Sequence, residues 1–213
     1  MGETKTITDI QPQVKRKDRC SIFLDGEFAF GIHQDILLKA GIGKGDVLTE
    51  DQINHILSLE RIHEGRTKAI RLLAHRARST KELRDRLLRH GFSKEHIDII
   101  LADLERLQLV DDAQFALLYA RTRMVTRPCG RWLLRKELEQ KGILQKDITK
   151  ACEEAYRESS EKEIARTLAR KKSKSLGSLE SPVVKKRITD FLVRRGFHWD
   201  LINEIFEEWD DFS

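Results

Sequence analysis

The sequence has few cysteines and no long apolar run, and both absences narrow what the protein can be. Its three cysteines, Cys20, Cys129 and Cys152, are odd in number and far apart, and no Cys-x-x-Cys motif is present. They favour a reducing compartment and predict neither a disulfide framework nor a zinc site. No apolar run reaches the roughly 18 residues of a membrane span, and the amino-terminal residues lack the order of a signal peptide. We therefore expect a soluble, cytoplasmic protein without a membrane partner.

Patterns that carry catalysis or bind metals are also absent. Ser79 and Ser93 occupy helix-cap positions and Cys152 a core position, so no nucleophile, base and orienting group can be assembled. The glycine-rich segment 41–46 lacks both the preceding buried strand and the Lys-Ser/Thr pair of a phosphate-binding loop. The histidines and carboxylates form no group with the spacing of a metal site. The histidines are His33, His55, His63, His75, His90, His96 and His198. We predict a protein that is not an enzyme and has no metal or other cofactor.

A sequence template that occurs three times is the main positive signal. In each copy two apolar residues four positions apart are followed, four residues later, by a glycine and then by further apolar or aromatic positions. The copies are Leu83, Leu87, Gly91, Phe92, Ile97, Leu101; Leu134, Leu138, Gly142, Ile143, Ile148, Cys152; and Ile188, Leu192, Gly196, Phe197, Ile202, Phe206. Such repetition is typical of proteins whose units bury their apolar faces against one another and present an extended binding surface. We predict a mainly all-α protein of three tandem three-helix repeats.

The amino-terminal part differs, because residues 7–14 and 20–32 alternate apolar and polar side chains. Asp25-Gly26 supplies the positive φ angles of a tight turn, so we predict a small β-hairpin element of two or three strands. One face of the element consists of Cys20, Ile22 and Leu24. Phe23, Phe28 or Phe30 is expected to dock the element on a neighbouring helix.

The predicted boundaries follow from caps and turn residues. Thr49 is expected to cap a helix from Glu50 that runs to about Leu59 or continues towards Arg78, with Gly65 as the expected break. Ser79, Ser93 and Asp111 are expected to cap later helices. The resulting segments are a β-hairpin extension with a short helix at 1–48, a linking helix at 49–66, repeat 1 at 67–110, repeat 2 at 111–157, and repeat 3 with an acidic tail at 158–213.

Charge is distributed unevenly along the chain. The net charge is +5, but residues 66–136 hold seventeen Lys and Arg against eight Asp and Glu, and 113–136 hold six cations and no acid. Residues 199–213 carry acidic side chains and no Lys or Arg. A basic centre and an acidic tail indicate a polyanionic or acidic partner.

The candidate interface consists of outward cations near the turns between the first and second helices of repeats 1 and 2. They are Arg76, Arg78, Lys81, Arg86, Arg89, Arg121, Arg123, Arg127, Arg131 and Lys136. Trp132 joins them. It either stacks on a base or anchors a protein contact, or it belongs to the core, whereas Tyr119 is expected in the core. Charge runs are usually solvated faces, but unbalanced charge repels itself and is expected to face DNA phosphate or an acidic protein groove.

Arg84 lies between apolar neighbours on its helix and has two interpretations. Its guanidinium either reaches an acidic partner or pairs within the fold. We favour pairing within the fold, with an acid at the repeat junction, Asp111 or Asp112.

Four motifs occur in order between Thr67 and Tyr156: Arg71–Ser79, Glu82–Phe92, Leu109–Ala116 and Arg135–Ile143. Together they resemble the RecX family, bacterial regulators of the RecA recombinase. Repeat 3 resembles the family more loosely, and Leu24–Phe28 resembles an extension found in some longer members. Cys129 departs from the pattern, since the resemblance leads us to expect a lysine there.

The resemblance implies a modular helical protein that binds along the deep groove of the RecA filament on single-stranded DNA. Such proteins limit filament extension, ATP hydrolysis, strand exchange and co-protease function, and they carry out no reaction of their own. Two other readings remain open: a helical nucleic-acid-binding protein that acts without RecA, and an enzyme with an unrecognised site. Strong DNA binding without RecA binding would favour the first, and a deep pocket with convergent polar residues the second.

Overall fold

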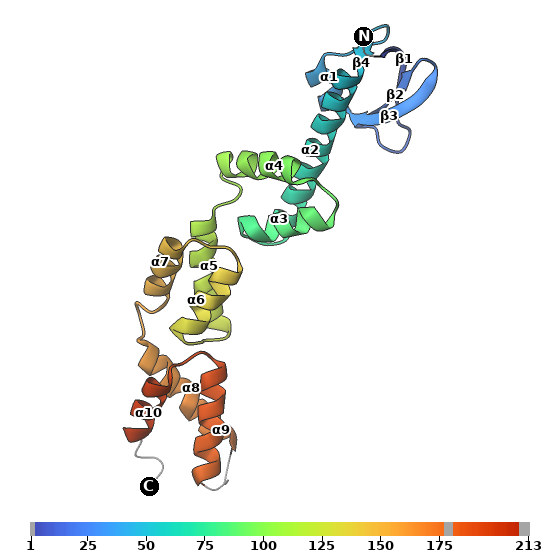
Figure 1. The fold of residues 1–213 in the computed structure, drawn as a ribbon. Helices are drawn as coiled ribbons and strands as arrows, with labels where there is room; N and C mark the ends of the chain where they lie inside the picture. The colour runs from blue at the N-terminus through green and yellow to red at the C-terminus, as the bar shows by residue number, and fades with distance from the viewer. Residues whose placement is uncertain (1–2, 177–180, 209–213) are drawn as a thin grey trace. The chain divides into compact units, whose positions relative to one another are not determined.

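The computed structural model describes residues 3–176 and 181–208, in which a small sheet precedes a series of helices (Figure 1). The strands are β1 (Thr4–Pro12), β2 (Arg19–Leu24), β3 (Glu27–His33) and β4 (Val47–Thr49). The helices are α1 (Gln34–Ala40), α2 (Glu50–His75), α3 (Thr80–Arg89), α4 (Lys94–Arg106), α5 (Asp112–Thr126), α6 (Arg131–Gln140), α7 (Gln145–Ala155), α8 (Glu161–Leu176), α9 (Ser181–Arg194) and α10 (Trp199–Glu207). None of the described helices combines the length and apolar character that a membrane span requires.

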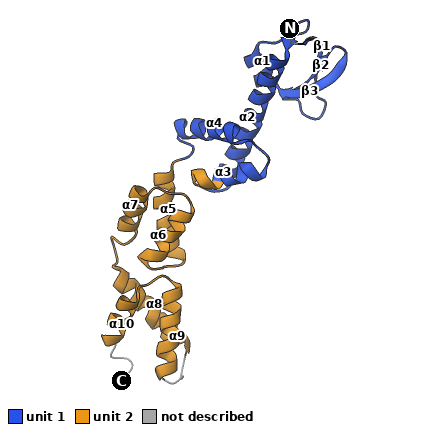
Figure 2. Ribbon diagram, viewed as in Figure 1, with its two compact units in different colours: residues 1–77, 83–110 blue, residues 78–82, 111–213 orange. Residues whose placement is uncertain are grey.

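The chain forms two units (Figure 2). Unit 1 comprises Met1–Ala77 and Leu83–Val110, and unit 2 comprises Arg78–Glu82 and Asp111–Ser213. Unit 1 therefore holds the sheet and most of the first helical triplet, whereas unit 2 holds the second and third triplets together with the first turn of α3.

Each helical triplet has a hydrophobic core built on the repeated template, so the predicted fold class is confirmed. The paired apolar residues of the template are fully buried in every copy: Leu83 and Leu87, Leu134 and Leu138, Ile188 and Leu192. They lie in three separate clusters, one for each triplet. The template glycines Gly91, Gly142 and Gly196 have φ angles of 76°, 79° and 80°, which let the chain leave the second helix in the left-handed conformation.

The amino-terminal sheet is larger than predicted. It has four antiparallel strands in the order β3-β2-β1-β4, because Val47–Thr49 adds a strand that the sequence did not indicate. The predicted face of Cys20, Ile22 and Leu24 is buried, and Ile56 of α2 belongs to the same core cluster as Ile22 and Leu24. The turn at Asp25-Gly26 has positive φ angles as predicted.

The three aromatic residues of the hairpin have different environments. Phe30 packs against the core cluster that includes Ile56 of α2, as expected of a docking residue. Phe28 is 60% exposed and meets the ring of Phe23 edge-on, with the ring centroids 5.9 Å apart. Docking therefore depends on Phe30 and the aliphatic face of the sheet.

The helix break predicted at Gly65 is wrong. Thr49 forms the predicted capping box with Gln52, and α2 then continues without interruption to His75. Gly65 is buried in mid-helix, where an added Cβ atom would lie 2.4 Å from Cδ1 of Ile100 on α4. The glycine therefore permits the close approach of α4, and the boundary expected between 66 and 67 falls inside one helix.

The other predicted caps are present. Ser79 Oγ accepts from the Glu82 N–H, Ser93 Oγ from the His96 N–H, and Asp111 Oδ1 from the Gln114 N–H. The expected acidic tail is described only as far as Glu208; its remaining residues, 209–213, lie outside the described part.

Candidate nucleic-acid interface

The predicted interface residues divide between the two units. Unit 1 contains Arg76, Arg86 and Arg89, and unit 2 contains Arg78, Lys81, Arg121, Arg123, Arg127, Arg131, Trp132 and Lys136. Arg76 and Arg89 are exposed and donate to the carbonyl oxygens of Ala77 and Asp85, each close by in the chain. Their charge is thus not neutralised by these two contacts.

Three of the predicted interface residues of repeat 2 are exposed and have no ion-pair partner among the described residues. We call them the repeat-2 cations: Arg121, Arg127 and Lys136. Lys136 lies over the indole of Trp132, 4.8 Å from the ring centroid, and Trp132 is 59% exposed. Lys136 therefore offers positive charge beside an accessible aromatic ring, and Arg121 and Arg127 offer it on α5 and on the α5–α6 connection.

Arg123 does not face outward as predicted. Its guanidinium donates from Nε and Nη2 to the two carboxylate oxygens of Glu137 on α6, at 2.9 and 3.0 Å, and its side chain is 14% exposed. The Tyr119 hydroxyl donates to the same carboxylate at 2.9 Å. Arg123 follows Tyr119 by four residues, so both lie on the face of α5 that packs against the repeat core.

This network shifts the ionisation of its tyrosine. The pKa of Tyr119 is raised to about 12, first by burial and then by the hydrogen bond to Glu137 and its charge. Tyr119 also packs against the core of repeat 2, which confirms the predicted core position. Arg123, Glu137 and Tyr119 thus form a structural link between α5 and α6.

Arg131 is held on two sides. Its guanidinium carbon lies 4.3 Å from the centroid of the Tyr156 ring, and its Nε lies 3.5 Å from Glu161 Oε2. The Arg131 backbone N–H donates to Glu161 Oε1 at 2.8 Å. With 44% of its side chain exposed, Arg131 keeps an accessible edge but contributes mainly to joining repeat 2 to repeat 3.

The same junction occurs at the start of α3. The backbone N–H of Thr80, the first residue of α3, donates to Asp112 Oδ1 at 2.8 Å, and Asp112 is the first residue of α5. Arg131 and Glu161 correspond to Thr80 and Asp112, because Arg131 is the first residue of α6 and Glu161 is the first residue of α8. In both cases an acid from the following repeat satisfies an orphan donor at a helix N-terminus.

A second contact strengthens each junction. Ser79 Oγ donates to the Lys141 carbonyl at 2.7 Å, and the Gly130 N–H donates to the Arg195 carbonyl at 2.8 Å. The turn that precedes the second helix of a repeat is therefore covered by the next repeat. Lys81 also contacts the next repeat, because its ammonium donates to the Gln140 carbonyl at 2.9 Å. Part of the predicted cationic interface thus joins repeats to each other.

Positive charge concentrates near the second junction. Arg195 donates to the Pro128 carbonyl at 2.7 Å. Its pKa is lowered, first by burial and then by the neighbouring charges of Arg127 and Arg123. Cys129, between Pro128 and Gly130, is fully buried, and burial raises the pKa of its thiol to about 11. The departure at Cys129 thus places an inert thiol in the core.

Arg84 pairs within the fold, as favoured from the sequence, but with a different acid. Its guanidinium lies 2.5 Å from Asp98 on α4, in the same repeat, rather than near Asp111 or Asp112. Both of those acids instead serve at the start of α5, Asp111 as the cap and Asp112 as the junction acid.

Two features of unit 1 escaped the sequence analysis. The first is a groove of about 680 Å³ that includes Arg86 among its lining residues. The second is a group of His33, Asp35 and His63, whose potential ligand atoms lie within 4.8 Å of one another. His33 and His63 are too far apart in the sequence to suggest a metal site.

The local geometry accounts for this group without a metal ion. His33 Nδ1 accepts from the Asp35 N–H and so caps α1, and the rings of His33 and His63 pack with centroids 4.2 Å apart. Within the described chain, these three residues nevertheless have the donor types of a divalent-metal site, and their potential ligand atoms lie close enough together to hold such an ion.

Comparison with known proteins gives consistent matches along the chain. The family model described as "Regulatory protein RecX N-terminal domain" matches residues 5–49, and those described as the first, second and third three-helix domains of RecX match 66–104, 111–151 and 160–206. The protein named "Regulatory protein RecX" from Listeria welshimeri is 34% identical over 191 residues, covering 90% of this chain and 71% of that protein. The Bacillus licheniformis protein of the same name is 35% identical over 204 residues, covering 96% and 77%.

Solved structures agree with these matches. One described as "Crystal structure of regulatory protein RecX" has a TM-score of 0.75 at 28% identity and covers 96% of this chain and 100% of that chain. The structure of RecX from Lactobacillus salivarius has a TM-score of 0.61 at 28% identity and covers 71% and 98%.

Proposed function

Because the chain belongs to the RecX family of regulatory proteins, we propose that it binds the RecA filament on single-stranded DNA and modulates RecA, mostly by inhibition. The affected activities are strand exchange, ATP hydrolysis and co-protease function, as in homologous recombination, DNA repair and the SOS response. The protein acts by binding, without a reaction or cofactor of its own, in the cytoplasm.

The observation that best supports this proposal is the unneutralised charge of the repeat-2 cations. Arg121, Arg127 and Lys136 have no carboxylate partners among the described residues, and Lys136 lies over the exposed ring of Trp132. A filament of RecA on DNA offers acidic protein surface and phosphate together. Tandem repeats that contact successive protomers add weak contacts through a high effective concentration, so binding becomes slow to reverse.

The proposed interface is narrower than the one expected from the sequence. Its centre is the repeat-2 cations with Trp132, and the other predicted cations extend it: Arg76, Arg78, Lys81, Arg86, Arg89 and Arg131. Arg123 is left out because Glu137 neutralises it inside the repeat.

Co-sedimentation tests the proposed partner. The full chain is centrifuged with RecA filaments on single-stranded DNA, and separately with the same DNA without RecA, over a series of salt concentrations. We expect the chain to pellet with the filaments at salt concentrations at which it no longer binds free DNA. Strong binding to DNA without binding to RecA filaments would refute the proposal in favour of a nucleic-acid-binding protein that acts alone.

A further inference from the structure

Unit 1 contains a groove whose lining residues, apart from Arg86, take no part in the proposed interface with the RecA filament. It has a volume of about 680 Å³ and is bounded by α2, by the end of α3 and by the segment that joins β1 to β2. All of its lining residues belong to unit 1. Its walls therefore come from the amino-terminal sheet and the first helical triplet.

One face of α2 forms the floor of the groove. Arg61, Glu64, Lys68, Arg71 and His75 follow one another at alternating intervals of three and four residues, and all of them line it. This spacing places side chains along one side of a helix. The floor is thus a row in which cations and imidazoles outnumber acids.

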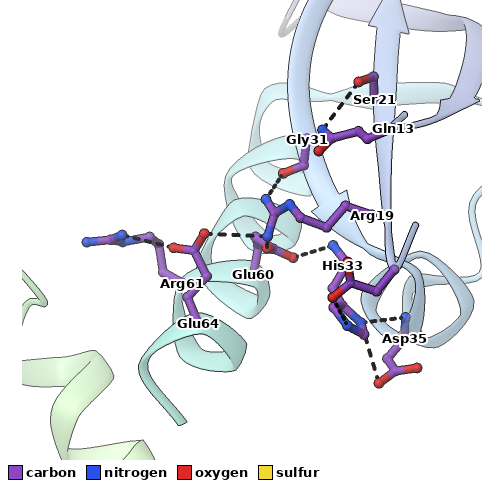
Figure 3. A network of polar contacts seen from close by, with 10 residues as sticks. Gln13, Arg19, Ser21, Gly31, His33, Asp35, Glu60, Arg61 and Glu64 are labelled. Atoms are coloured by element: carbon purple, nitrogen blue, oxygen red, sulfur yellow. Dashed lines mark hydrogen bonds and ion pairs between the residues drawn. The ribbon is translucent and has the colours of Figure 1, made fainter. Parts of the chain in front are cut away.

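Two of the arginines are neutralised at the edge of the groove. Arg19 lies 2.5 Å from Glu60 and also donates to the Gly31 carbonyl, and Arg61 lies 3.0 Å from Glu64 (Figure 3). The pair of Arg19 and Glu60 links the sheet to α2, whereas Arg61 and Glu64 pair within α2. The second pair engages Glu64, one of the two acids that line the groove.

Four further cations in the groove remain without a carboxylate partner in the described part of the chain: Arg16, Lys68, Arg71 and Arg86. The second acid, Asp18, lies 3.5 Å from His33. Arg16, Arg71 and Arg86 are exposed and Lys68 is half-buried. The groove therefore holds an excess of accessible positive charge on three separate segments of the fold.

The charges are close enough to influence each other. The pKa of His90, which lines the groove, is lowered, first by desolvation and then by the charges of Lys68, Arg86 and Arg89. Cations gathered in this way repel one another, and a bound polyanion relieves the repulsion.

The types of side chain in the groove favour a nucleic acid over an acidic peptide as the bound polyanion. Four histidines line the groove, His33, His63, His75 and His90, together with the guanidinium planes of the arginines. Imidazole and guanidinium planes stack on unpaired bases, whereas the charged ends of Arg and Lys hold phosphates. An acidic peptide would use only the second of these features.

We infer that the groove of unit 1 is a binding site for single-stranded DNA, in which Arg16, Lys68, Arg71 and Arg86 hold phosphates and the histidines stack on bases. The site requires no RecA and is separate from the repeat-2 cations. Its failure would leave the proposed regulation of RecA untouched.

Fluorescence anisotropy with a labelled oligothymidylate tests the site in the full chain without RecA. The double variant Lys68→Glu/Arg71→Glu reverses two floor cations, and Lys94→Glu reverses an exposed cation of unit 1 outside the groove. We expect binding by the double variant to weaken by about tenfold or more, which corresponds to the loss of two phosphate contacts. The slope of log affinity against log salt should fall in magnitude by about 1.4, since each contact with single-stranded DNA contributes about 0.7. Lys94→Glu should bind as the unaltered chain does.

Three results would overturn the inference. They are unchanged affinity in the double variant, an equal loss in Lys94→Glu, and competition by polyglutamate as effective as that by unlabelled oligothymidylate. If thermal melting shows that the double variant does not fold, Arg16→Glu replaces it, because Arg16 lies in the connection between β1 and β2 and outside the core. The same affinity loss is expected for that variant, and unchanged affinity would again contradict the site.

Discussion

At the scale of residues, α5 of repeat 2 illustrates how an arginine becomes structural. Arg123 faces Glu137 on α6, whereas Arg127, just after the helix, has no acidic partner in the described chain. A double hydrogen bond to a carboxylate is strong when both groups are shielded from water. Arg123 therefore supports the repeat and Arg127 is available to a partner.

The Tyr119 hydroxyl gives a pH-dependent readout of this network. The pKa of Tyr119 is raised to about 12, against about 10 for an unfolded tyrosine, so folding favours the neutral phenol. Its contribution to stability is complete below about pH 10 and is lost as the pH rises through the folded value. Glu137→Gln should lower the pKa of Tyr119, because it removes a charge that disfavours the phenolate.

Phenolate absorbance during an alkaline titration checks this prediction. The chain has two tyrosines, and the pKa of Tyr156 is also raised, mainly by burial. Little phenolate should form near pH 10 while circular dichroism still reports folded helix. Glu139→Gln, on the exposed side of α6, is the control and should leave the titration unchanged. A full phenolate signal at pH 10 in the folded protein would contradict the buried, hydrogen-bonded environment described for Tyr119.

Residue-level prediction from the sequence succeeded where the interaction is local. The caps at Thr49, Ser79, Ser93 and Asp111 bond to a backbone N–H three residues later, so their signal lies in a short segment of chain. The inward position of Arg123 depends on where α6 lies, which the spacing within α5 does not encode.

At the scale of elements, α2 shows that a glycine can have either of two structural roles. The absence of a Cβ atom permits a turn, and it equally permits a neighbouring helix to approach. Gly65 serves the second purpose, with Ile100 and Phe92 over its Cα. The sequence favoured the turn. Because a break was expected at Gly65, the side chains from Arg61 to His75 could not be recognised as one continuous row on a single helix. The groove was missed for the same reason.

Substitution of Gly65 tests which of the two structural roles this glycine has. Gly65→Leu places a side chain where Ile100 and Phe92 already pack, so it should lower the free energy of unfolding by about 1–3 kcal/mol. Ala74→Leu, at an exposed position of the same helix, should change it by less than about 0.5 kcal/mol. Urea denaturation measures both. Equal stability of the two variants would mean that α4 does not pack on Gly65.

At the scale of the whole molecule, a recurring junction joins the repeats of unit 2. Thr80 with Asp112 and Arg131 with Glu161 are corresponding pairs, and each uses an acid at the start of the next repeat. The repeats themselves were predictable because their template is periodic and local. The junctions and the fourth strand were not, since they depend on contacts between segments distant in the chain.

The central claim is that the repeats regulate RecA through exposed cations, and the rate of ATP hydrolysis by RecA on single-stranded DNA tests it most directly. Three forms are compared: the unaltered chain, Arg127→Glu, and Lys146→Glu as a control on an exposed position of α7. We expect the unaltered chain and Lys146→Glu to inhibit equally, and Arg127→Glu to require on the order of tenfold more protein, with a shallower dependence of its inhibition on salt. An ATPase rate that the unaltered chain leaves unchanged at saturating concentration would contradict the account.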